Sequence, residues 1–259
     1  MTKGTVMAAK QKFLLRDVSF YYGDQPALKQ INLEVLDREI LAVIGPAMSG
    51  KSTLLRVLNR LSDLAEEGRL EGQVLLDGKD IHDPEVSVTQ LRARVGIVFA
   101  VPVPLPLSIW ENVAYGPQLR RDKRKKELDI LVEKSLRAAA LWDEIKDRLE
   151  DPAMALSGGQ QQRLCLARVL ALQPEVILLD EPCSGLDPIS TMKVEEALLL
   201  LKEDHSIVIV PHNVQQASRI GDKVAFLLMG ELVEQGLAEQ VFTTPGDSRT
   251  DDYITGRFG

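Results

Sequence analysis

Nine consecutive residues near the start of the chain have the spacing of a phosphate-binding loop. The stretch reads GPAMSGKST and fits the pattern G-x-x-x-x-G-K-[ST]. The apolar run Glu39–Ile44 before it predicts a buried strand, and the leucine and valine stripe of Lys51–Leu61 after it predicts a helix. Backbone N–H groups of such a loop form an anion nest, and the helix N-terminus adds its positive end. The residues that we expect to bind a nucleotide here are Gly45, Pro46, Ala47, Met48, Ser49, Gly50, Lys51, Ser52 and Thr53.

Two side chains of this loop can take part in chemistry. Lys51 can reach the β- and γ-phosphates, and the Ser52 hydroxyl can lie on Mg²⁺. The alternative is a chance glycine turn before a core helix. The order of strand, loop and helix favours the phosphate site, because this is the context that the pattern needs.

An acidic pair follows a second apolar run. Val176–Leu179 predicts a buried strand, and Asp180 and Glu181 come directly after it. Asp180 would leave the sheet beside the phosphate loop and hold Mg²⁺ through water. Glu181 points the other way, so it can polarise an attacking water as a general base. An exposed acidic turn after a core strand is the alternative.

A second anion cradle begins another predicted helix. The sequence LSGGQ places four candidate phosphate-binding residues at its start: Ser157, Gly158, Gly159 and Gln160. One nucleotide does not need two such cradles from the same face. We therefore expect the second cradle to cap a γ-phosphate that is bound to another subunit. An N-cap followed by flexible glycines is the alternative.

Composition limits the classes of protein to which the chain can belong. The chain has 259 residues, of which 45% are hydrophobic and 27% charged, as in ordinary globular proteins. Its net charge of −7 offers no basic field for nucleic acid. Two cysteines, Cys165 and Cys183, indicate no disulfide framework and favour a reducing compartment. Met1–Lys12 lacks the apolar core of a signal peptide, and no run of 18 apolar residues occurs, so a membrane role would need a partner.

The order of predicted elements indicates an α/β fold with two additions. Strand-like runs at 13–20, 28–36 and 72–81 suggest an antiparallel sheet, whereas strands and helices alternate elsewhere, as around a mostly parallel sheet. Residues from about 100 to 160 look mainly helical and include predicted helices at 127–140 and 142–149. Proline-rich Val101–Leu107 leads into them, and Ser108 with Glu111 has capping-box spacing. We interpret the basic run Arg120–Lys126 as a solvated connector, with a lipid or partner contact as the alternative.

Taken in order, these motifs resemble the ATPase subunit of an ATP-binding-cassette (ABC) transporter over nearly the whole chain. Four stretches are similar, more narrowly, to the phosphate-importing ATPases of bacteria: Ser108–Pro117, Asp180–Ser190, His212–Ala217 and the tail Asp252–Gly259. The resemblance implies a P-loop NTPase core with an antiparallel β subdomain, formed by residues 13–99 and 161–259. It also implies an inserted α-helical subdomain at about 100–160 that carries the LSGGQ signature.

The resemblance also implies roles for three further residues. Tyr22 matches the aromatic that stacks on adenine, although a half-buried tyrosine at a strand end is the alternative. Asp187 matches the loop that crosses the dimer interface. His212 matches the switch histidine that contacts the γ-phosphate, whereas a lone histidine after an apolar strand is more often structural. The implied cofactors are ATP and Mg²⁺, and the implied catalytic residues are Glu181, His212 and Lys51.

The assembly that the resemblance implies is a head-to-tail homodimer on the cytoplasmic face of the cell membrane. Two transmembrane permease subunits would dock on the helical insertion and its loop Val101–Leu107, and a solute-binding protein would act indirectly. No nucleic acid is expected. Phosphate is the expected cargo, with another oxyanion or an amino acid as alternatives. A soluble ABC ATPase of DNA repair or the ribosome is a further alternative, but such proteins usually carry coiled-coil insertions or two cassettes.

Three positions depart from the pattern of that family. Ala100 stands where glutamine usually supplies an amide to Mg²⁺ and links the site to the membrane subunits. Alanine has neither donor nor acceptor. Met48 stands where glycine is usual, so its side chain must turn away from the phosphates. Pro211 precedes the histidine where threonine is common, which stiffens the switch.

The first prediction concerns the missing amide. We expect Ala100 to lower catalytic turnover more than ATP affinity, because the lost contact lies on the metal side of the site. Ala100→Gln should therefore raise the ATPase rate measured at saturating ATP. An unchanged rate would count against this account.

Overall fold

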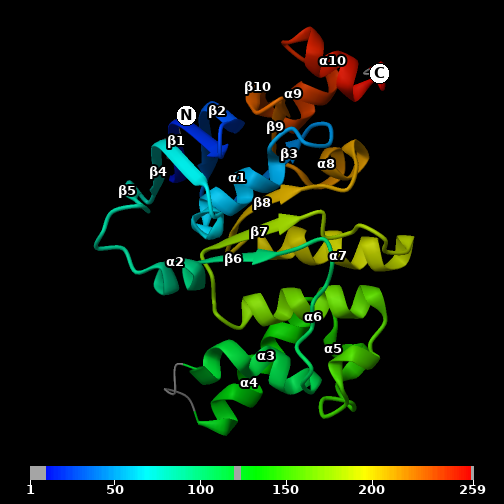
Figure 1. The fold of residues 1–259 in the computed structure, drawn as a ribbon. Helices are drawn as coiled ribbons and strands as arrows, with labels where there is room; N and C mark the ends of the chain where they lie inside the picture. Colours follow the sequence, from blue (N-terminus) through cyan, green and yellow to red (C-terminus); the bar gives the residue numbers. More distant parts are fainter. Residues whose placement is uncertain (1–9, 120–123, 258–259) are drawn as a thin grey trace, which may run out of the picture.

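The computed structural model of the chain describes residues 10–119 and 124–257. Figure 1 shows a larger sheet, a smaller sheet at its side and a layer of helices beneath the larger one. The larger sheet has the strand order β10-β9-β3-β8-β7-β6. Its strands are β3 (Ile40–Ile44), β6 (Val95–Val98), β7 (Val176–Asp180), β8 (Ser206–Val210), β9 (Lys223–Leu228) and β10 (Glu231–Leu237).

Only the edge strand β10 runs antiparallel in this sheet; the other pairings are parallel. Every residue of β3 and β8 is buried, as expected for strands that are covered on both faces. Alternate residues of β3 therefore belong to different cores. Leu41 and Val43 face one core, whereas Ile40, Ala42 and Ile44 face the other.

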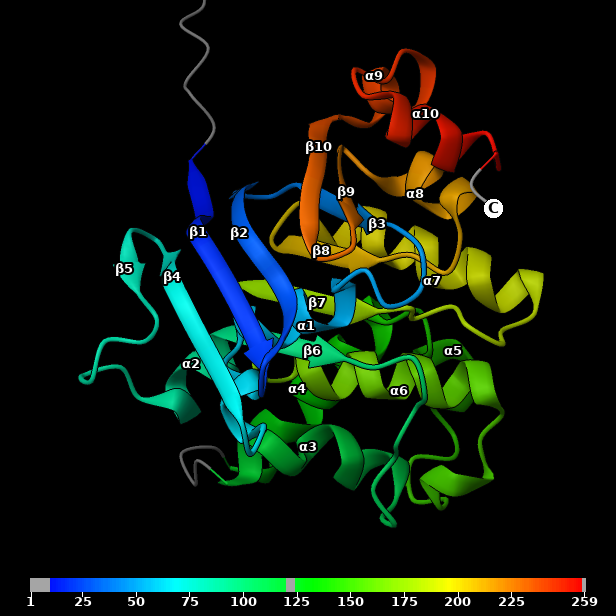
Figure 2. The same ribbon diagram turned by 45° about the horizontal axis from the view of Figure 1, so that its top comes forward.

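The smaller sheet is antiparallel and packs over the phosphate-loop helix. It has the order β2-β1-β4-β5 and comprises β1 (Gln11–Tyr22), β2 (Gln25–Leu36), β4 (Gly68–Leu76) and β5 (Lys79–Asp80). Its apolar residues share a core with α1 (Lys51–Leu58) and one face of the larger sheet. Figure 2 shows β2 beside α1, followed by β1 and β4, with β5 at the far edge of this sheet. The predicted antiparallel sheet beside an α/β core is confirmed.

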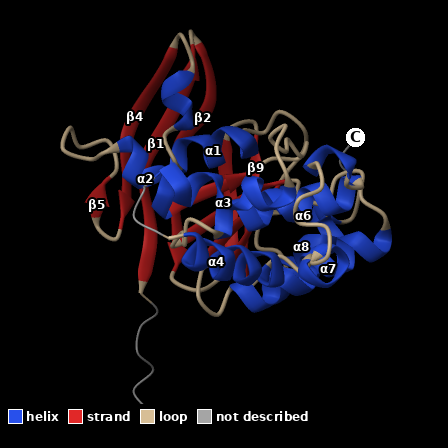
Figure 3. Ribbon diagram, turned by 90° about the horizontal axis from the view of Figure 1, so that it is seen from below, coloured by secondary structure: helices blue, strands red, loops and turns tan. Residues whose placement is uncertain are grey.

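The helices fall mainly on the other face of the larger sheet. Figure 3 shows the molecule from below, so that α3 and α4 lie in front of the strands. The helices after α1 are α2 (Val88–Arg94), α3 (Ile109–Leu119), α4 (Lys125–Ala138), α5 (Trp142–Ile145), α6 (Gly158–Leu170), α7 (Pro188–Leu201), α8 (Val214–Ile220), α9 (Ala238–Thr243) and α10 (Ser248–Ile254). Short 3-10 turns lie at Leu61–Leu64 and Ala153–Ala155.

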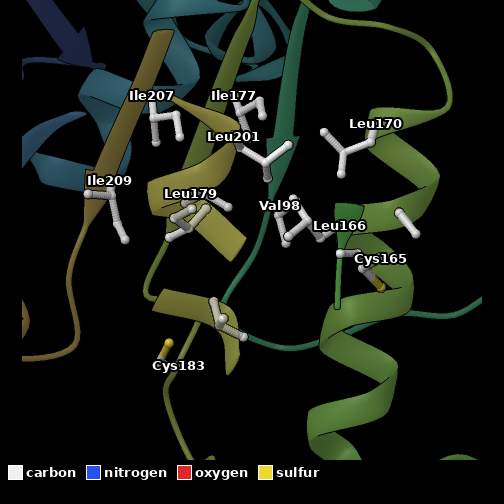
Figure 4. Close-up of a cluster of buried hydrophobic side chains, with 14 of the residues drawn as sticks. Val98, Cys165, Leu166, Leu170, Ile177, Leu179, Cys183, Leu201, Ile207 and Ile209 are labelled. Atoms are coloured by element: carbon white, nitrogen blue, oxygen red, sulfur yellow. The ribbon is translucent and has the colours of Figure 1, made fainter. Parts of the chain in front are cut away.

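Apolar packing joins the helical layer to the sheet. In Figure 4, Leu166 and Leu170 of α6 lie opposite Ile177 and Leu179 of β7, with Val98 of β6 between them. Burial of such side chains contributes roughly 1.5–3 kcal/mol each. The helical layer therefore has little freedom to separate from the strands that carry the acidic pair.

The predicted helical stretch from about 100 to 160 is largely helical, with one boundary that differs. We expected a helix over 142–149, but α5 ends at Ile145. Hydrogen bonds from Arg148 to Ile145 and from Asp151 to Arg148 then form successive turns. The predicted capping box before α3 is present, because Ser108 and Glu111 each accept a hydrogen bond from the backbone of the other.

Two of the expectations fall partly outside the described residues. Residues 1–9 of the N-terminal segment and 120–123 of the basic run are not described. Arg124 caps α4, and Lys125 and Lys126 are exposed in its first turn. Across residues 10–119 and 124–257, the structure contains no helix with the length and apolar character needed to cross a membrane.

A cluster of charges ties the smaller sheet to the larger one. The Lys12 ammonium is 3.0 Å from Asp77 and 2.5 Å from Glu175, although only 5% of Lys12 is exposed. Arg94 contacts the same two carboxylates, at 2.8 Å and 2.6 Å. Hydrogen bonding to Arg94, opposed by burial and aided by Lys12, lowers the pKa of Glu175 to about 2. This cluster fixes the start of β1 against the start of β7.

The second prediction uses this cluster. Glu175→Gln should lower the free energy of unfolding by about 1–2 kcal/mol at pH 7, because Glu175 is partly exposed and its ion pairs are screened. The stabilisation of the fold by ionised Glu175 is complete above the ordinary carboxyl pKa of 4.5, and it is lost as pH falls towards 2. Urea unfolding should therefore show that the substitution lowers the free energy of unfolding at pH 3 by less than half as much as at pH 7.

Glu196→Gln, at an exposed position on α7, is the matched control and should change stability little at either pH. If Glu175→Gln lowered the free energy of unfolding equally at pH 7 and pH 3, the stabilising role of the ion pairs of Glu175 with Lys12 and Arg94 would be contradicted.

Candidate nucleotide-binding site

The phosphate loop runs where a side chain cannot fit at its two glycines. Gly45 has φ +148°, and a Cβ there would lie 2.1 Å from the Leu227 carbonyl oxygen. At Gly50, with φ +98°, a Cβ would lie 2.5 Å from the Ala27 carbonyl oxygen. Because neighbouring backbone atoms leave no room for a Cβ and both φ angles are positive, only glycine fits at these two positions.

Met48 shows why glycine is expected at its own position. Its φ is +60°, in the left-handed region that costs a non-glycine residue roughly 1–2 kcal/mol. Its side chain is fully exposed. The Met48 side chain therefore points into solvent.

Polar groups of the loop fit a phosphate chain. The Ser49 hydroxyl is buried and has no hydrogen-bond partner within the described part of the chain. The Lys51 ammonium donates to the carbonyl oxygens of Gly45 at 2.8 Å and Pro46 at 2.7 Å. Burial lowers the pKa of Lys51, and the charges of Glu181 and Asp180 oppose this shift. Phosphate oxygens are stronger acceptors for this cation than the carbonyls that it now contacts.

The oxygen pair expected to hold Mg²⁺ is assembled. The Ser52 hydroxyl donates to Asp180 Oδ1 at 3.1 Å, and both groups are the hard oxygen ligands that Mg²⁺ prefers. Within residues 10–119 and 124–257, no group of three or more His, Cys, Asp or Glu side chains forms a metal cluster. A magnesium ion here would accordingly take its other ligands from phosphate and water.

Three predicted catalytic residues share one small cavity. It has a volume of about 230 Å³, and its lining includes Lys51, Glu181 and His212. Glu181 has φ +45°, and its N–H donates to Val210 at 2.9 Å, so the chain turns sharply after Asp180. Asp180 accepts from the Ser52 hydroxyl, whereas Glu181 lines the cavity. The carboxyl ends of β3, β7 and β8 meet here, as in other parallel sheets that bind ligands.

An adjoining cavity extends from the loop to Tyr22. Its volume is about 460 Å³, and Tyr22, Lys51, Thr53 and Glu181 are among its lining residues. Tyr22 is 38% exposed, and its ring packs edge-on against Phe20 with centroids 5.0 Å apart. The ring is exposed at the cavity edge, and its hydroxyl lies 3.4 Å from the Thr53 hydroxyl.

The second predicted cradle is well formed but lies elsewhere. Ser157 caps α6, and Ser157 and Gln160 exchange side-chain to backbone hydrogen bonds of 3.4 Å and 3.0 Å. Ser157 and Gly158 are exposed, whereas a Cβ at Gly159 would lie 2.6 Å from the Ser190 hydroxyl. Neither cavity described above is lined by Ser157–Gln160. The fold therefore does not bring the two cradles of one chain together.

Asp187 also lies outside both cavities. It caps α7 by accepting from the N–H groups of Ile189 and Ser190, each at 3.0 Å, and from the Ser190 hydroxyl at 2.6 Å. Hydrogen bonds from Ser190 lower its pKa. Asp187 is therefore held at the exposed start of α7, close in space to the Gly159 turn.

Sequence reasoning missed the residues that hold these turns in place. The Glu144 carboxylate accepts from Gln160 at 3.0 Å, from Arg163 at 2.7 Å and from Lys193 of α7 at 2.6 Å. These contacts lower the pKa of Glu144 to about 2, with Arg163 as the main cause. Glu144 resembles any surface acid in the sequence, because its partners lie 16 to 49 positions away.

Gln216 is a second such residue. It is 1% exposed, accepts from the His212 N–H at 2.9 Å and donates to Glu195 of α7 at 3.1 Å. The spacing of Asn213 and Gln216 could have indicated it, because a glutamine three residues after an N-cap residue often reaches back to the backbone at the start of the helix.

Comparison with known proteins gives consistent matches. A family model described as ABC transporter matches residues 28–184. The phosphate import ATP-binding protein PstB 3 of Streptococcus pneumoniae serotype 4 is 55% identical over 247 residues, which cover 95% of this chain and 99% of that protein. The protein of the same name from Streptococcus pneumoniae strain R6 gives the same figures.

Solved structures give the same result for the fold. The structure of cbiO1 from Clostridium perfringens, part of the ABC transporter complex cbiONQ, has a TM-score of 0.80 at 26% identity and covers 96% of this chain and 97% of its own. A dimeric post-hydrolysis structure of the ATP-binding cassette MJ0796, bound to ADP and Pi, has a TM-score of 0.76 at 29% identity. It covers 87% of this chain and 98% of its own.

Proposed function

The chain belongs to the ABC transporter family as one of its ATPases, and we propose that it energises the import of inorganic phosphate as a head-to-tail homodimer. The observation that carries the catalytic part is the convergence of Lys51, Glu181 and His212 on one cavity beside the phosphate loop. The 55% identity to a protein named for phosphate import supports the cargo.

The separation of the two cradles supports the pairing of two copies. In this proposal, Gly45–Thr53 of one copy grips the triphosphate, and Ser157–Gln160 of the other copy approaches its γ-phosphate. The exposure of Ser157 and Gly158 supports this arrangement, because this end of α6 is open to a second chain, while the Ser157 N–H donates to Gln160 within its own chain. A relative, MJ0796, is described as dimeric with ADP and Pi.

Each residue of the loop cavity then has a distinct task. Lys51 moves from the loop carbonyls to the β- and γ-phosphates, and Tyr22 stacks on adenine. Glu181 orients and polarises the attacking water, while His212 contacts the γ-phosphate. Ser52 and Asp180 would hold Mg²⁺, which would neutralise charge on the phosphate oxygens. Asp187 would act across the interface between the two copies.

The helical layer offers a surface for membrane subunits. A cavity of about 940 Å³ lies between α2 and α3, and Gly116, Leu119 and Leu172 help to line it. Val101 and Val103 of the proline-rich loop are 72% and 62% exposed. Apolar exposure of this kind fits a protein interface. We propose that two permease subunits dock here, that the dimer lies on the cytoplasmic face of the membrane, and that a solute-binding protein acts only through the permease.

Closure of the dimer would supply the mechanical step. ATP bound between the copies favours the closed pair, and hydrolysis releases it, so the helical layers and the docked permeases move as rigid bodies. The contacts of Glu144 support this transmission, because they connect the LSGGQ turn to α7 of the core.

The third prediction tests the base and the dimer together. Glu181→Gln should lower kcat by about 10²- to 10⁴-fold, because the amide cannot take a proton from water. The variant should form a dimer at saturating ATP, measured by gel filtration. Glu203→Gln, exposed after α7, is the control and should hydrolyse ATP normally. A Glu181→Gln variant that stays monomeric at saturating ATP would contradict the pairing.

The fourth prediction tests the cargo. A strain without this chain should take up labelled phosphate slowly under low phosphate, and the wild-type chain should restore uptake while Glu181→Gln should not. Normal phosphate uptake in the deletion strain, together with a defect for another oxyanion or an amino acid, would contradict phosphate as the cargo. That result would leave the assignment of ATP hydrolysis unchanged.

A further inference from the structure

The C-terminal helix α10 brings a tyrosine to the start of the phosphate loop. The Tyr253 ring stacks on Phe226 of β9, with centroids 5.0 Å apart and planes at 20°. Phe226 is fully buried and pairs in register with Ile44 of β3. Because Ile44 directly precedes Gly45, this stack places Tyr253 beside the first residue of the loop.

The hydroxyl of Tyr253 contacts that residue. Burial raises the pKa of Tyr253, and a hydrogen bond with the Gly45 backbone opposes the increase. A hydrogen bond that favours the charged form of a phenol must donate to its oxygen, so the Gly45 N–H is the donor. The Gly45 carbonyl meanwhile accepts from Lys51 at 2.8 Å. The backbone of Gly45 therefore connects Tyr253 to the lysine that is to bind phosphate.

Tyr253 also lines the catalytic cavity. The cavity of about 230 Å³ has Lys51, Glu181, His212 and Tyr253 on its walls. Tyr253 comes from α10, whereas the other lining residues belong to Ile44–Lys51, to the turn at Glu181 and to the segment Pro211–Val214. The C-terminal segment thus forms one wall of the space assigned above to the γ-phosphate.

The helix that carries Tyr253 is itself firmly attached. Glu234 of β10 accepts from the N–H groups of Gly246 at 2.8 Å and Asp247 at 3.2 Å. Asp247 caps α10 through the Arg249 N–H at 2.8 Å, and Thr250 is fully buried. These contacts hold α10 without help from the Tyr253 hydroxyl, so removal of that hydroxyl should leave the helix in place.

We propose that Tyr253 is a positioning residue for ATP hydrolysis, which fixes Gly45 while Lys51 leaves the loop carbonyls for the phosphates. This inference rests on the proposed assignment of the loop to ATP. A fixed Gly45 keeps the first turn of the loop open when the lysine moves, and so keeps the γ-phosphate aligned with Glu181 and His212. ADP lacks the γ-phosphate that Glu181 and His212 are proposed to meet here, so its binding should depend less on the hydroxyl than ATP turnover does.

The test compares purified full-length variants. Tyr253→Phe keeps the ring and removes the hydroxyl, whereas Tyr253→Leu removes the stack as well. Tyr21→Phe is the matched control, since the Tyr21 hydroxyl contacts Glu71 on the antiparallel sheet, outside the cavity. The measurements are kcat and KM for ATP, ADP affinity by calorimetry, and the melting temperature.

We expect Tyr253→Phe to lower kcat by about three- to tenfold, as for loss of one neutral hydrogen bond at a reacting site. Its ADP affinity should stay within about twofold of wild type, and its melting temperature within about 2 °C. Amide exchange of Gly45, followed by NMR, should be faster in this variant. Tyr253→Leu should lower both kcat and melting temperature, and Tyr21→Phe should match wild type.

Two outcomes would overturn the inference. One is a Tyr253→Phe variant whose kcat equals that of the wild type. The other is a parallel fall in kcat, ADP affinity and melting temperature, which would assign Tyr253 a purely structural role. Failure of the proposed function is distinguishable, because full ATP turnover by Glu181→Gln would contradict the catalytic site whatever Tyr253 does.

Discussion

The close approach of Gly45 to the backbone of β9 is the contact on which the site depends. A Cβ at this position would overlap the Leu227 carbonyl, so the chain leaves β3 with no side chain between the two strands. The parallel pairing of β3 with β8 and β9 then places the loop, the Val210–His212 segment and Phe226 at one edge of the sheet. Gly45, His212 and Tyr253 line one cavity there because the backbones can come this near.

The two faces of β3 pack against different cores, and both cores hold this edge of the sheet in place. Leu41 and Val43 pack towards α1 and the antiparallel sheet, while Ile40, Ala42 and Ile44 pack towards the helical layer and α10. A shift of β3 by one residue would exchange the two sets and displace the loop from Asp180. Register in the sheet therefore fixes the geometry of the site more strictly than any polar contact, whose net contribution is about 1 kcal/mol.

The local features of the site could be predicted from the sequence, whereas its supports could not. The strand and helix on either side of Gly45–Gly50, the turn after β7 and the capped start of α6 each follow from neighbouring residues and are present in the structure, while the binding roles of these segments stay predictions. Glu144 and Tyr253 gain their roles from partners far along the chain, which no local pattern specifies. The helix expected at 142–149 was too long for a similar reason, since apolar spacing continues after the backbone has turned.

Ala100 is best understood together with the helix that lies beside it. Gln162 of α6 is 2% exposed and donates to the Phe99 carbonyl at 2.9 Å, so the helical layer already holds the backbone that leads to position 100. The other end of this amide, Gln162 Oε1, has no hydrogen-bond partner among the described residues. A buried acceptor in this state costs about 1–3 kcal/mol. Although residue 100 has no side-chain amide, α6 is still linked to the end of β6, because Gln162 donates to the backbone carbonyl of Phe99. We propose that movement of the helical layer reaches the catalytic edge through Phe99, so that alanine at position 100 leaves this mechanical connection intact.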